Sequence, residues 1–139
     1  MDKPIINGNT ITIPSSQDYL VNVDDFVESY LDRKKVDKSV IADIAICVTE
    51  IVINGIIHGN QSNPDKKVKV AIEKEESRVR VVIFDEGKGF DPEDIANPIA
   101  EENLLKEVGR GIFIVKSLMD EVTVVHEKDG TKTTIVKNL

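Results

Sequence analysis

Cysteine, histidine and tryptophan are scarce in this chain of 139 residues, and their scarcity excludes several kinds of site. The sequence holds one cysteine, two histidines and no tryptophan. Cys47 cannot form an internal disulfide, and because it lies in an apolar segment we expect a small core residue rather than a nucleophile. One cysteine and two distant histidines offer too few ligands for a zinc site.

Clustered positive charge is also missing. The formal net charge is −7 and the 18 lysines and arginines are scattered, which argues against nucleic-acid binding. We identify no apolar run long enough to cross a bilayer, and no charged-then-apolar signal segment at the start of the chain. We therefore expect a cytoplasmic protein that binds neither nucleic acid nor membrane.

The composition, 40% hydrophobic and 31% charged, instead fits a globular protein with a single domain over residues 1–139. Residues 92–108, where periodicity weakens, are expected to form a mobile loop with a turn of helix near 101–106. The other expected elements, in chain order, are a strand at 10–13, helices at 16–33 (capped by Ser15 or Ser16) and 38–58, a hairpin around 68–72 and 79–83, a short helix at 112–119, and a hairpin of 122–126 with 131–136. This order predicts an α+β fold, a two-layer sandwich of helices on a mixed, largely antiparallel sheet.

The most informative segment is the expected helix 38–58, in which a carboxylate and an amide stand among apolar residues. Glu50 and Asn54 are four residues apart, so they share a face of the helix. Apolar residues on nearly all sides predict that this helix is buried. Because burying an ionisable group without a partner is costly, two polar groups on one stripe of such a helix indicate a site.

A glycine-containing segment follows the second expected hairpin strand. Asp85 ends that strand and precedes Gly87 and Gly89. One interpretation is an ordinary turn, since aspartate and glycine are common at strand ends. The other is an acceptor carboxylate at the bottom of a pocket, where the glycines let a flat ligand approach the backbone.

A second glycine-containing segment, Gly109-Arg110-Gly111, precedes the short expected helix. It is either a loop-to-helix hinge or a phosphate-binding site, because free N–H groups and the helix dipole favour an anion at a helix start. Arg110 could add a charge-assisted contact. The spacing fits neither the P-loop nor the dinucleotide-binding pattern G-x-G-x-x-G.

In combination, these segments resemble the motifs of the GHKL (Bergerat-fold) ATPases. The likeness is greatest to the bacterial anti-sigma-factor serine-protein kinases, which have a histidine-kinase-like ATPase domain. Residues 49–60 (TEIVINGIIHGN) resemble the N-box, 85–91 (DEGKGFD) and 109–115 (GRGIFIV) the two glycine boxes, and 130–135 (GTKTTI) the terminal strand. A histidine kinase is disfavoured, because Ile57 stands where that branch usually has a basic residue and because no dimerisation helix with a phospho-acceptor histidine is found.

The resemblance implies roles for the residues at the phosphate end of an ATP site. Asn54 would be the ligand of a Mg²⁺ ion that bridges the phosphates, and Glu50 would be the general base or the water-orienting residue. Gly109, Arg110 and Gly111 would hold phosphates at the edge of a lid formed by residues 92–108. A metal, phosphate donors and an oriented nucleophile are what phosphoryl transfer chiefly needs.

The resemblance also implies how the base would be bound. Asp85 would accept a hydrogen bond from the adenine amino group, and Gly87 and Gly89 would shape the pocket. Thr133 or Thr131 would support the Asp85 contact through water. His58 and Lys88 receive no assigned role.

Two functions follow from this resemblance. The first is an anti-sigma-type protein serine/threonine kinase that phosphorylates a small anti-anti-sigma-like partner and sequesters a transcription factor. The second is a non-catalytic regulatory module in which ATP gates protein binding. A sigma factor as a second partner and a homodimer are left open.

Overall fold

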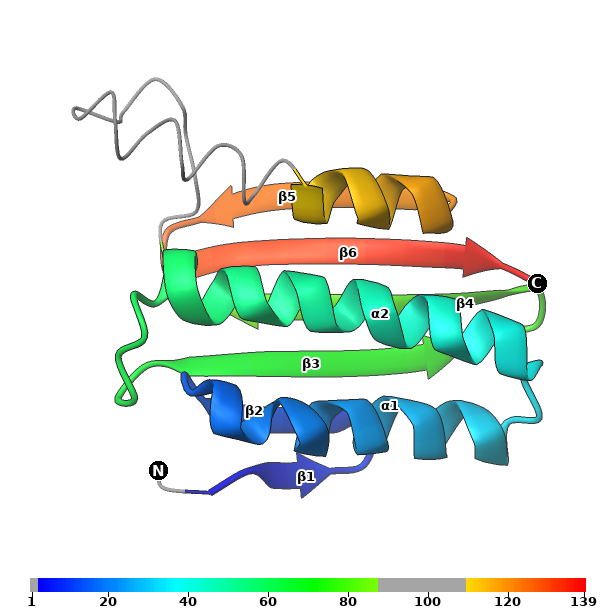
Figure 1. Cartoon of the computed structure of the whole chain (residues 1–139), viewed down its shortest axis with the longest axis horizontal. Coiled ribbons are helices and arrows are strands. Elements are labelled where there is room, and N and C mark those ends of the chain that lie inside the picture. The colour runs from blue at the N-terminus through cyan, green and yellow to red at the C-terminus, as the bar shows by residue number, and fades with distance from the viewer. Residues whose placement is uncertain (1–2, 88–109) are drawn as a thin grey trace.

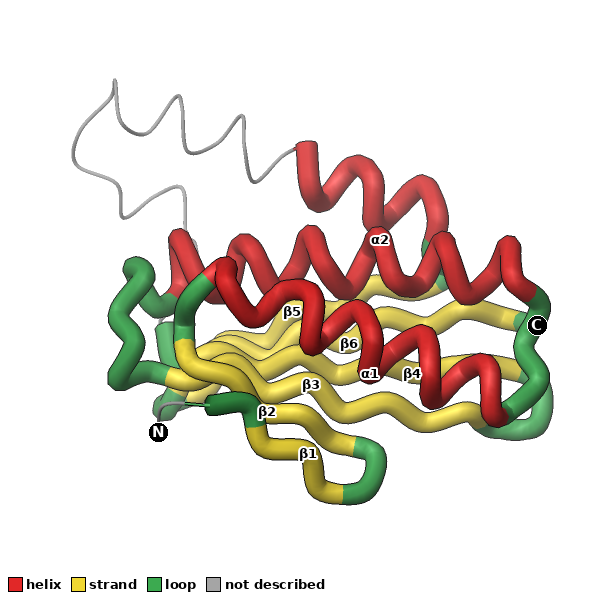
Figure 2. Tube along the Cα trace, turned by 60° about the horizontal axis from the view of Figure 1, so that its bottom comes forward, coloured by secondary structure: helices red, strands yellow, loops and turns green. Residues whose placement is uncertain are grey.

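The computed structural model describes residues 3–87 and 110–139, which form a two-layer α+β sandwich. Figure 1 and Figure 2 show the helices together on one face of a single sheet. This confirms the predicted fold class. The strands are β1 (Ile5–Asn7), β2 (Thr10–Pro14), β3 (Lys67–Lys74), β4 (Arg78–Asp85), β5 (Glu121–Glu127) and β6 (Gly130–Asn138). The helices are a 3-10 turn (Gln17–Tyr19), α1 (Leu20–Arg33), α2 (Lys38–Asn54), a π-helical turn (Gly55–Gly59) and a helix over residues 110–118.

The sheet has the strand order β1-β2-β3-β4-β6-β5. All five pairings are antiparallel, so among the described residues the sheet contains none of the parallel pairing that a mixed sheet would have. Both predicted hairpins are confirmed, as β3 with β4 and β5 with β6. Strand β1 escaped prediction because it has only three residues, all exposed, and therefore shows no alternation.

The core lies between the sheet and the helices. Buried isoleucine and valine side chains from β2, β3 and β4 alternate along each strand and face α1 and α2. Cys47 is fully buried in this core, and burial raises the pKa of its thiol to about 11, with a smaller contribution from nearby Asp43. Cys47 is therefore a core residue, as predicted, and is held as an unreactive thiol.

Helix α2 is less buried than its sequence predicts. It lies between α1 and the helix over residues 110–118 (Figure 1). Its inner residues are buried, as predicted, but Ile46 is 49% exposed, and Glu50 and Asn54 are half-buried. Within residues 3–87 and 110–139, the outer side of α2 is not covered by a further layer, so the burial is less complete than the sequence predicts.

The long apolar stretch of α2 also requires a correction. Among the described residues, the 22-residue segment Lys38–Gly59 is long and apolar enough, by length and composition, to cross a membrane, although the sequence analysis found no such run. The core helix of a soluble protein passes the same test, and Ile44, Val48 and Val52 of α2 are buried in the core of this fold.

Candidate functional site

Asp85, the last residue of β4, lies under the end of α2. Its side chain is 9% exposed and packs against the π-helical turn. A Cβ atom built on Gly59 would lie 2.5 Å from Asp85 Oδ1, and one built on Gly55 would lie 3.3 Å from Asp85 Oδ2. Two glycines on successive turns therefore let the helix backbone pack directly against this carboxylate.

The chain after β4 folds back onto the same place. The Gly87 N–H donates to Asp85 Oδ1 at 2.9 Å, and the hydroxyl of Thr131 donates to the Gly87 carbonyl at 3.2 Å. A Cβ atom on Gly87 would stand 2.1 Å from the Gly59 carbonyl oxygen. No side chain fits there, so the Gly87 backbone packs directly on the π-helical turn.

Burial raises the pKa of Asp85 to about 6. The hydrogen bond from the Gly87 N–H and the positive field of His126 act in the opposite direction and are smaller. His126 lies on β5, and its Nδ1 is 3.3 Å from Thr131 Oγ1. A carboxylate with a perturbed pKa beside glycine backbone is a typical candidate for a binding site.

Glu50 and Asn54 lie one helical turn apart on α2, and both face the start of the helix over residues 110–118. A Cβ atom on Gly111 would lie 3.2 Å from Asn54 Nδ2 and 3.3 Å from Glu50 Oε2. The two polar side chains and Gly111 are therefore in one place. Helix geometry separates Asn54 from Gly59 by about 7 Å along the axis. The pair Glu50 and Asn54 (the Glu50 end of the site) therefore lies next to the place where Asp85 packs against Gly59 (the Asp85 end).

The other predicted residues are placed as follows. Thr131 is the register partner of Asp85, while Thr133 pairs with Ile83 two residues along, and both threonine side chains are buried. Thr131 makes a hydrogen bond to the segment that follows Asp85, at the Gly87 carbonyl. Arg110 is exposed. Lys88, Gly89, Gly109 and the predicted loop 92–108 lie outside the described residues.

Sequence reasoning missed several residues at the Asp85 end. Gly55 and Gly59 lie inside the N-box resemblance, but their contacts with a strand end 30 and 26 residues away leave no local signal. The sequence predicts Gly130 only as the start of the terminal strand, yet a Cβ atom there would stand 2.0 Å from the Asp85 carbonyl oxygen. His126 alternates in an exposed strand, and nothing in its neighbours indicates a contact with Thr131.

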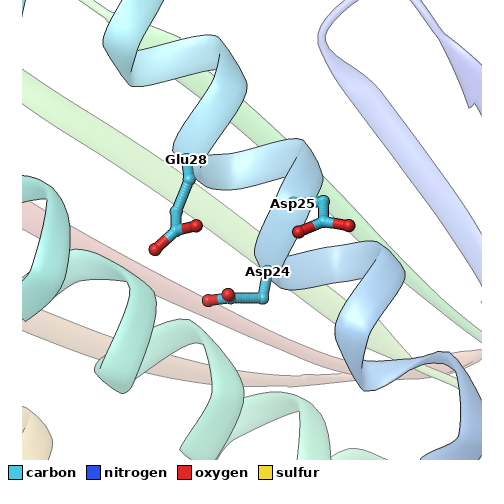
Figure 3. A group of neighbouring side chains, drawn as sticks. All are labelled: Asp24, Asp25 and Glu28. Atoms are coloured by element: carbon cyan, nitrogen blue, oxygen red, sulfur yellow. The ribbon is translucent and has the colours of Figure 1, made fainter.

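A groove between α1 and α2 leads toward Glu50. It encloses about 320 Å³ and is lined by Asp24, Glu28, Ala42, Ala45, Ile46, Thr49 and Glu50. Figure 3 shows Asp24 and Glu28 on α1 together with Asp25. Oxygens of these three carboxylates lie within 4.8 Å of one another. Exposed acidic groups commonly gather in this way without a metal, so we assign no ion to them.

Comparisons with known proteins identify relatives of this chain. The chain is 29% identical over 132 residues to the serine-protein kinase RsbW of Staphylococcus epidermidis, covering 90% of this chain and 82% of that protein. It is 32% identical over 126 residues to RsbW of Staphylococcus aureus, covering 86% and 79%. The enzyme class predicted from the sequence, a protein serine/threonine kinase, is the class that these relatives are named for.

Solved structures share the fold at low sequence identity. A chain of the SiaB–SiaC complex from Pseudomonas aeruginosa matches with a TM-score of 0.67 at 12% identity, covering 99% of this chain and 90% of that one. The RsbU and RsbW domains of Rv1364c from Mycobacterium tuberculosis match with a TM-score of 0.63 at 20% identity, covering 96% of this chain and 31% of that one. The family model described as the histidine kinase-like ATPase domain matches residues 13–137, and the chain therefore belongs to that family.

Proposed function

We propose that this protein is an ATP-dependent protein serine/threonine kinase of the RsbW type, which regulates a small protein partner by phosphorylation. The observation that carries the proposal is the position of Gly111 over Glu50 and Asn54, with the buried carboxylate of Asp85, at the end of β4, against the π-helical turn that follows the same helix. A nucleotide bound along the end of α2 would meet both groups of residues.

The Asp85 end fits a purine base. The missing side chains at Gly55, Gly59 and Gly87 let the backbone pack tightly around the carboxylate, which holds the Asp85 oxygens in a fixed position to meet a base. An ionised Asp85 accepts a hydrogen bond from the exocyclic amino group of adenine, whereas guanine offers an oxygen at that position. Thr131 fixes the Gly87 carbonyl and so supports the same pocket.

The Glu50 end fits phosphates and a divalent cation. Glu50 and Asn54 offer a carboxylate oxygen and an amide oxygen, and oxygen is the ligand that Mg²⁺ prefers. Asn54 would hold the ion, which when bound neutralises charge on the transferred phosphoryl group. Gly111 at the helix start and the exposed Arg110 would contribute backbone N–H groups and a positive charge to the phosphates.

Glu50 is the candidate general base. It lines the groove between α1 and α2, so a hydroxyl that enters along this groove would reach the carboxylate from the solvent side. Glu50 would accept the proton of that hydroxyl as the oxygen attacks the terminal phosphoryl group, and the hydroxyl oxygen would end as a phosphoester.

The identity of the partner is part of the proposal and is supported by the resemblance to the anti-sigma-factor kinases. We propose that the phosphorylated protein is small and anti-anti-sigma-like, and that the kinase sequesters a transcription factor such as a sigma factor. A homodimer and a cytoplasmic location belong to the same proposal.

Phosphoryl transfer from labelled ATP tests this function. The purified chain is incubated with radiolabelled ATP, Mg²⁺ and lysate of its own organism, with the Glu50→Gln variant in parallel. We expect a small protein to be labelled by the wild type only. If the wild type binds ATP but labels no protein, the ATP-gated binding module replaces the kinase. If it binds no ATP, both functions are wrong.

A further inference from the structure

Asn60 is the only side-chain amide that is fully buried among the described residues, and its side chain bonds to residues other than Glu50 and Asp85. It follows directly after the π-helical turn. Its Nδ2 donates to Ser15 Oγ at 2.8 Å and to the Lys67 carbonyl at 3.0 Å. Its Oδ1 accepts from the Glu86 N–H at 2.9 Å. Both amide hydrogens and the amide oxygen are therefore used.

The chemistry of these partners fixes the orientation of the amide. The Lys67 carbonyl can only accept and the Glu86 N–H can only donate, so exchanging the amide oxygen and nitrogen would break both contacts. Asn60 thus ties together the end of β2, the start of β3 and the residue after β4. An unpaired polar atom at a site with 0% exposure would carry the full cost of desolvation.

The bond to Glu86 reaches the base end of the site. Glu86 stands between Asp85 and Gly87, whose N–H donates to the Asp85 carboxylate. Thr131 holds the Gly87 carbonyl from the β6 side, and Asn60 holds the Glu86 N–H from the helix side. The three-residue segment that carries the acceptor carboxylate is anchored from two directions.

The geometry points to a role for Asn60 as a positioning residue for base recognition. By holding Glu86, Asn60 sets the distance between the Asp85 carboxylate and the backbone of Gly59. This distance determines how strongly the site prefers adenine to guanine. The inference rests on the proposed function only in taking Asp85 as the group that meets the base. Asn60 itself would not touch the nucleotide.

Base selectivity is the property that tests this role, because a purely structural residue would not change it. Calorimetric titration with ATP and GTP gives the ratio of their dissociation constants for each variant. For Asn60→Ala we expect the ratio of the GTP to the ATP dissociation constant to fall about tenfold or more, which is the effect of losing one hydrogen bond. Ser15→Ala removes one partner of the same amide but leaves the Glu86 bond, and should keep the wild-type ratio within about twofold.

A stability-matched control separates selectivity from loss of folding. Leu31→Ala opens a cavity at a fully buried position of α1 that makes no contact with Asp85, and should lower the melting temperature without changing the ratio. Equal ratios for Asn60→Ala and Leu31→Ala would overturn the role of Asn60. A wild type without any preference for ATP would instead overturn the assignment of Asp85.

Hydrogen exchange on the wild type covers the case in which Asn60→Ala does not fold. The Glu86 amide hydrogen should exchange slowly in the nucleotide-free protein, because Asn60 Oδ1 holds it. Exchange of the Glu86 amide at the rate of an unprotected peptide would contradict the proposal.

Discussion

Gly59 lies so close to Asp85 that a Cβ atom on Gly59 would stand 2.5 Å from Asp85 Oδ1 and 2.8 Å from its Cγ. Real Cβ atoms essentially never approach another atom this closely. The carboxylate keeps its position because residue 59 has no side chain, and the end of the helix therefore shapes the base end of the site.

Gly59→Ala should consequently displace Asp85 and weaken ATP binding by roughly 1–3 kcal/mol, the scale of a disrupted buried hydrogen bond. Calorimetric titration measures this loss. Gly8→Ala is the control: Gly8 has a φ of +61° and open space around its Cβ position, so the change strains a turn remote from Asp85. Equal ATP affinity for Gly59→Ala and the wild type would show that Asp85 does not contact the nucleotide.

The raised pKa of Asp85, about 6, makes ATP affinity depend on pH. In the proposed complex the ionised carboxylate accepts from the adenine amino group, and protonation removes the charge that strengthens this hydrogen bond. ATP affinity should therefore fall as the pH drops through 6. The phosphates of ATP also titrate in this range, so Asp85→Asn is titrated over the same pH values. The difference between the two curves should shrink below pH 6, and parallel curves would rule out Asp85 as the titrating group.

The same pKa predicts a gain in stability for Asp85→Asn. Because the folded-state pKa lies above the ordinary value of 3.8, protonation stabilises the fold, and this contribution is present below pH 3.8 and lost as the pH rises through 6. At pH 7 the buried charge costs about 3 kcal/mol, from two pKa units at 1.36 kcal/mol each. Asp85→Asn should raise the free energy of unfolding at pH 7 by about 1–3 kcal/mol, and thermal melts at pH 4 and 7 measure the change.

Local patterns explain which parts could be predicted from the sequence. The spacing of Glu50 and Asn54 depends only on helix periodicity, and the alternation in β3 and β4 fixes the inward faces of a sheet. The glycines after Asp85 signal a break in the strand. These features depend on residues within a few positions of one another, so the helices, both hairpins and the two ends of the site follow from the sequence.

Contacts between distant segments could not be predicted in the same way. Gly59 meets Asp85 across 26 positions, and His126 meets Thr131 only because β5 lies beside β6 at the edge of the sheet. Whether Ile46 is exposed depends on which helices pack beside α2. The apolar character of Ile46 does not indicate which helices these are. The π-helical turn at Gly55–Gly59 is wider than an α-helical turn, but its five residues are too few to change the apolar pattern, so the sequence predicts one continuous helix.

Gly111→Ala tests the phosphate end of the site. Its Cβ atom would meet Asn54 Nδ2 at 3.2 Å and Glu50 Oε2 at 3.3 Å, contacts that the ends of two side chains can relieve by small shifts. We expect little change in melting temperature and a several-fold loss of ATP affinity. Adenosine, which has no phosphates, is the control ligand and should bind wild type and variant equally well. A parallel loss for adenosine would place the effect at the base end instead.

Asn54→Ala should abolish Mg²⁺-dependent ATP binding with little loss of stability, because it would remove the proposed metal ligand from a half-buried position of α2. Titration with ATP in the presence and absence of Mg²⁺ measures the effect. The wild type should bind ATP more tightly with Mg²⁺, and the variant should bind equally weakly in both conditions. A variant that retains the full Mg²⁺ effect would show that Asn54 is not the ligand.

Glu50→Gln distinguishes a kinase from an ATP-gated binding module. The change preserves the size of the side chain and removes its ability to take a proton. ATP binding should persist while transfer to the partner protein falls by about 10²–10⁴-fold, the usual contribution of a general base. Glu28→Gln is the matched control, because Glu28 lines the same groove from α1 but is not among the side-chain atoms nearest Gly111. That variant should transfer phosphate at the wild-type rate if the groove only admits the partner. Equal losses of transfer rate for both variants would mean that Glu28 and Glu50 both act through their charge, by attracting the partner protein. Glu50 would then not be the base.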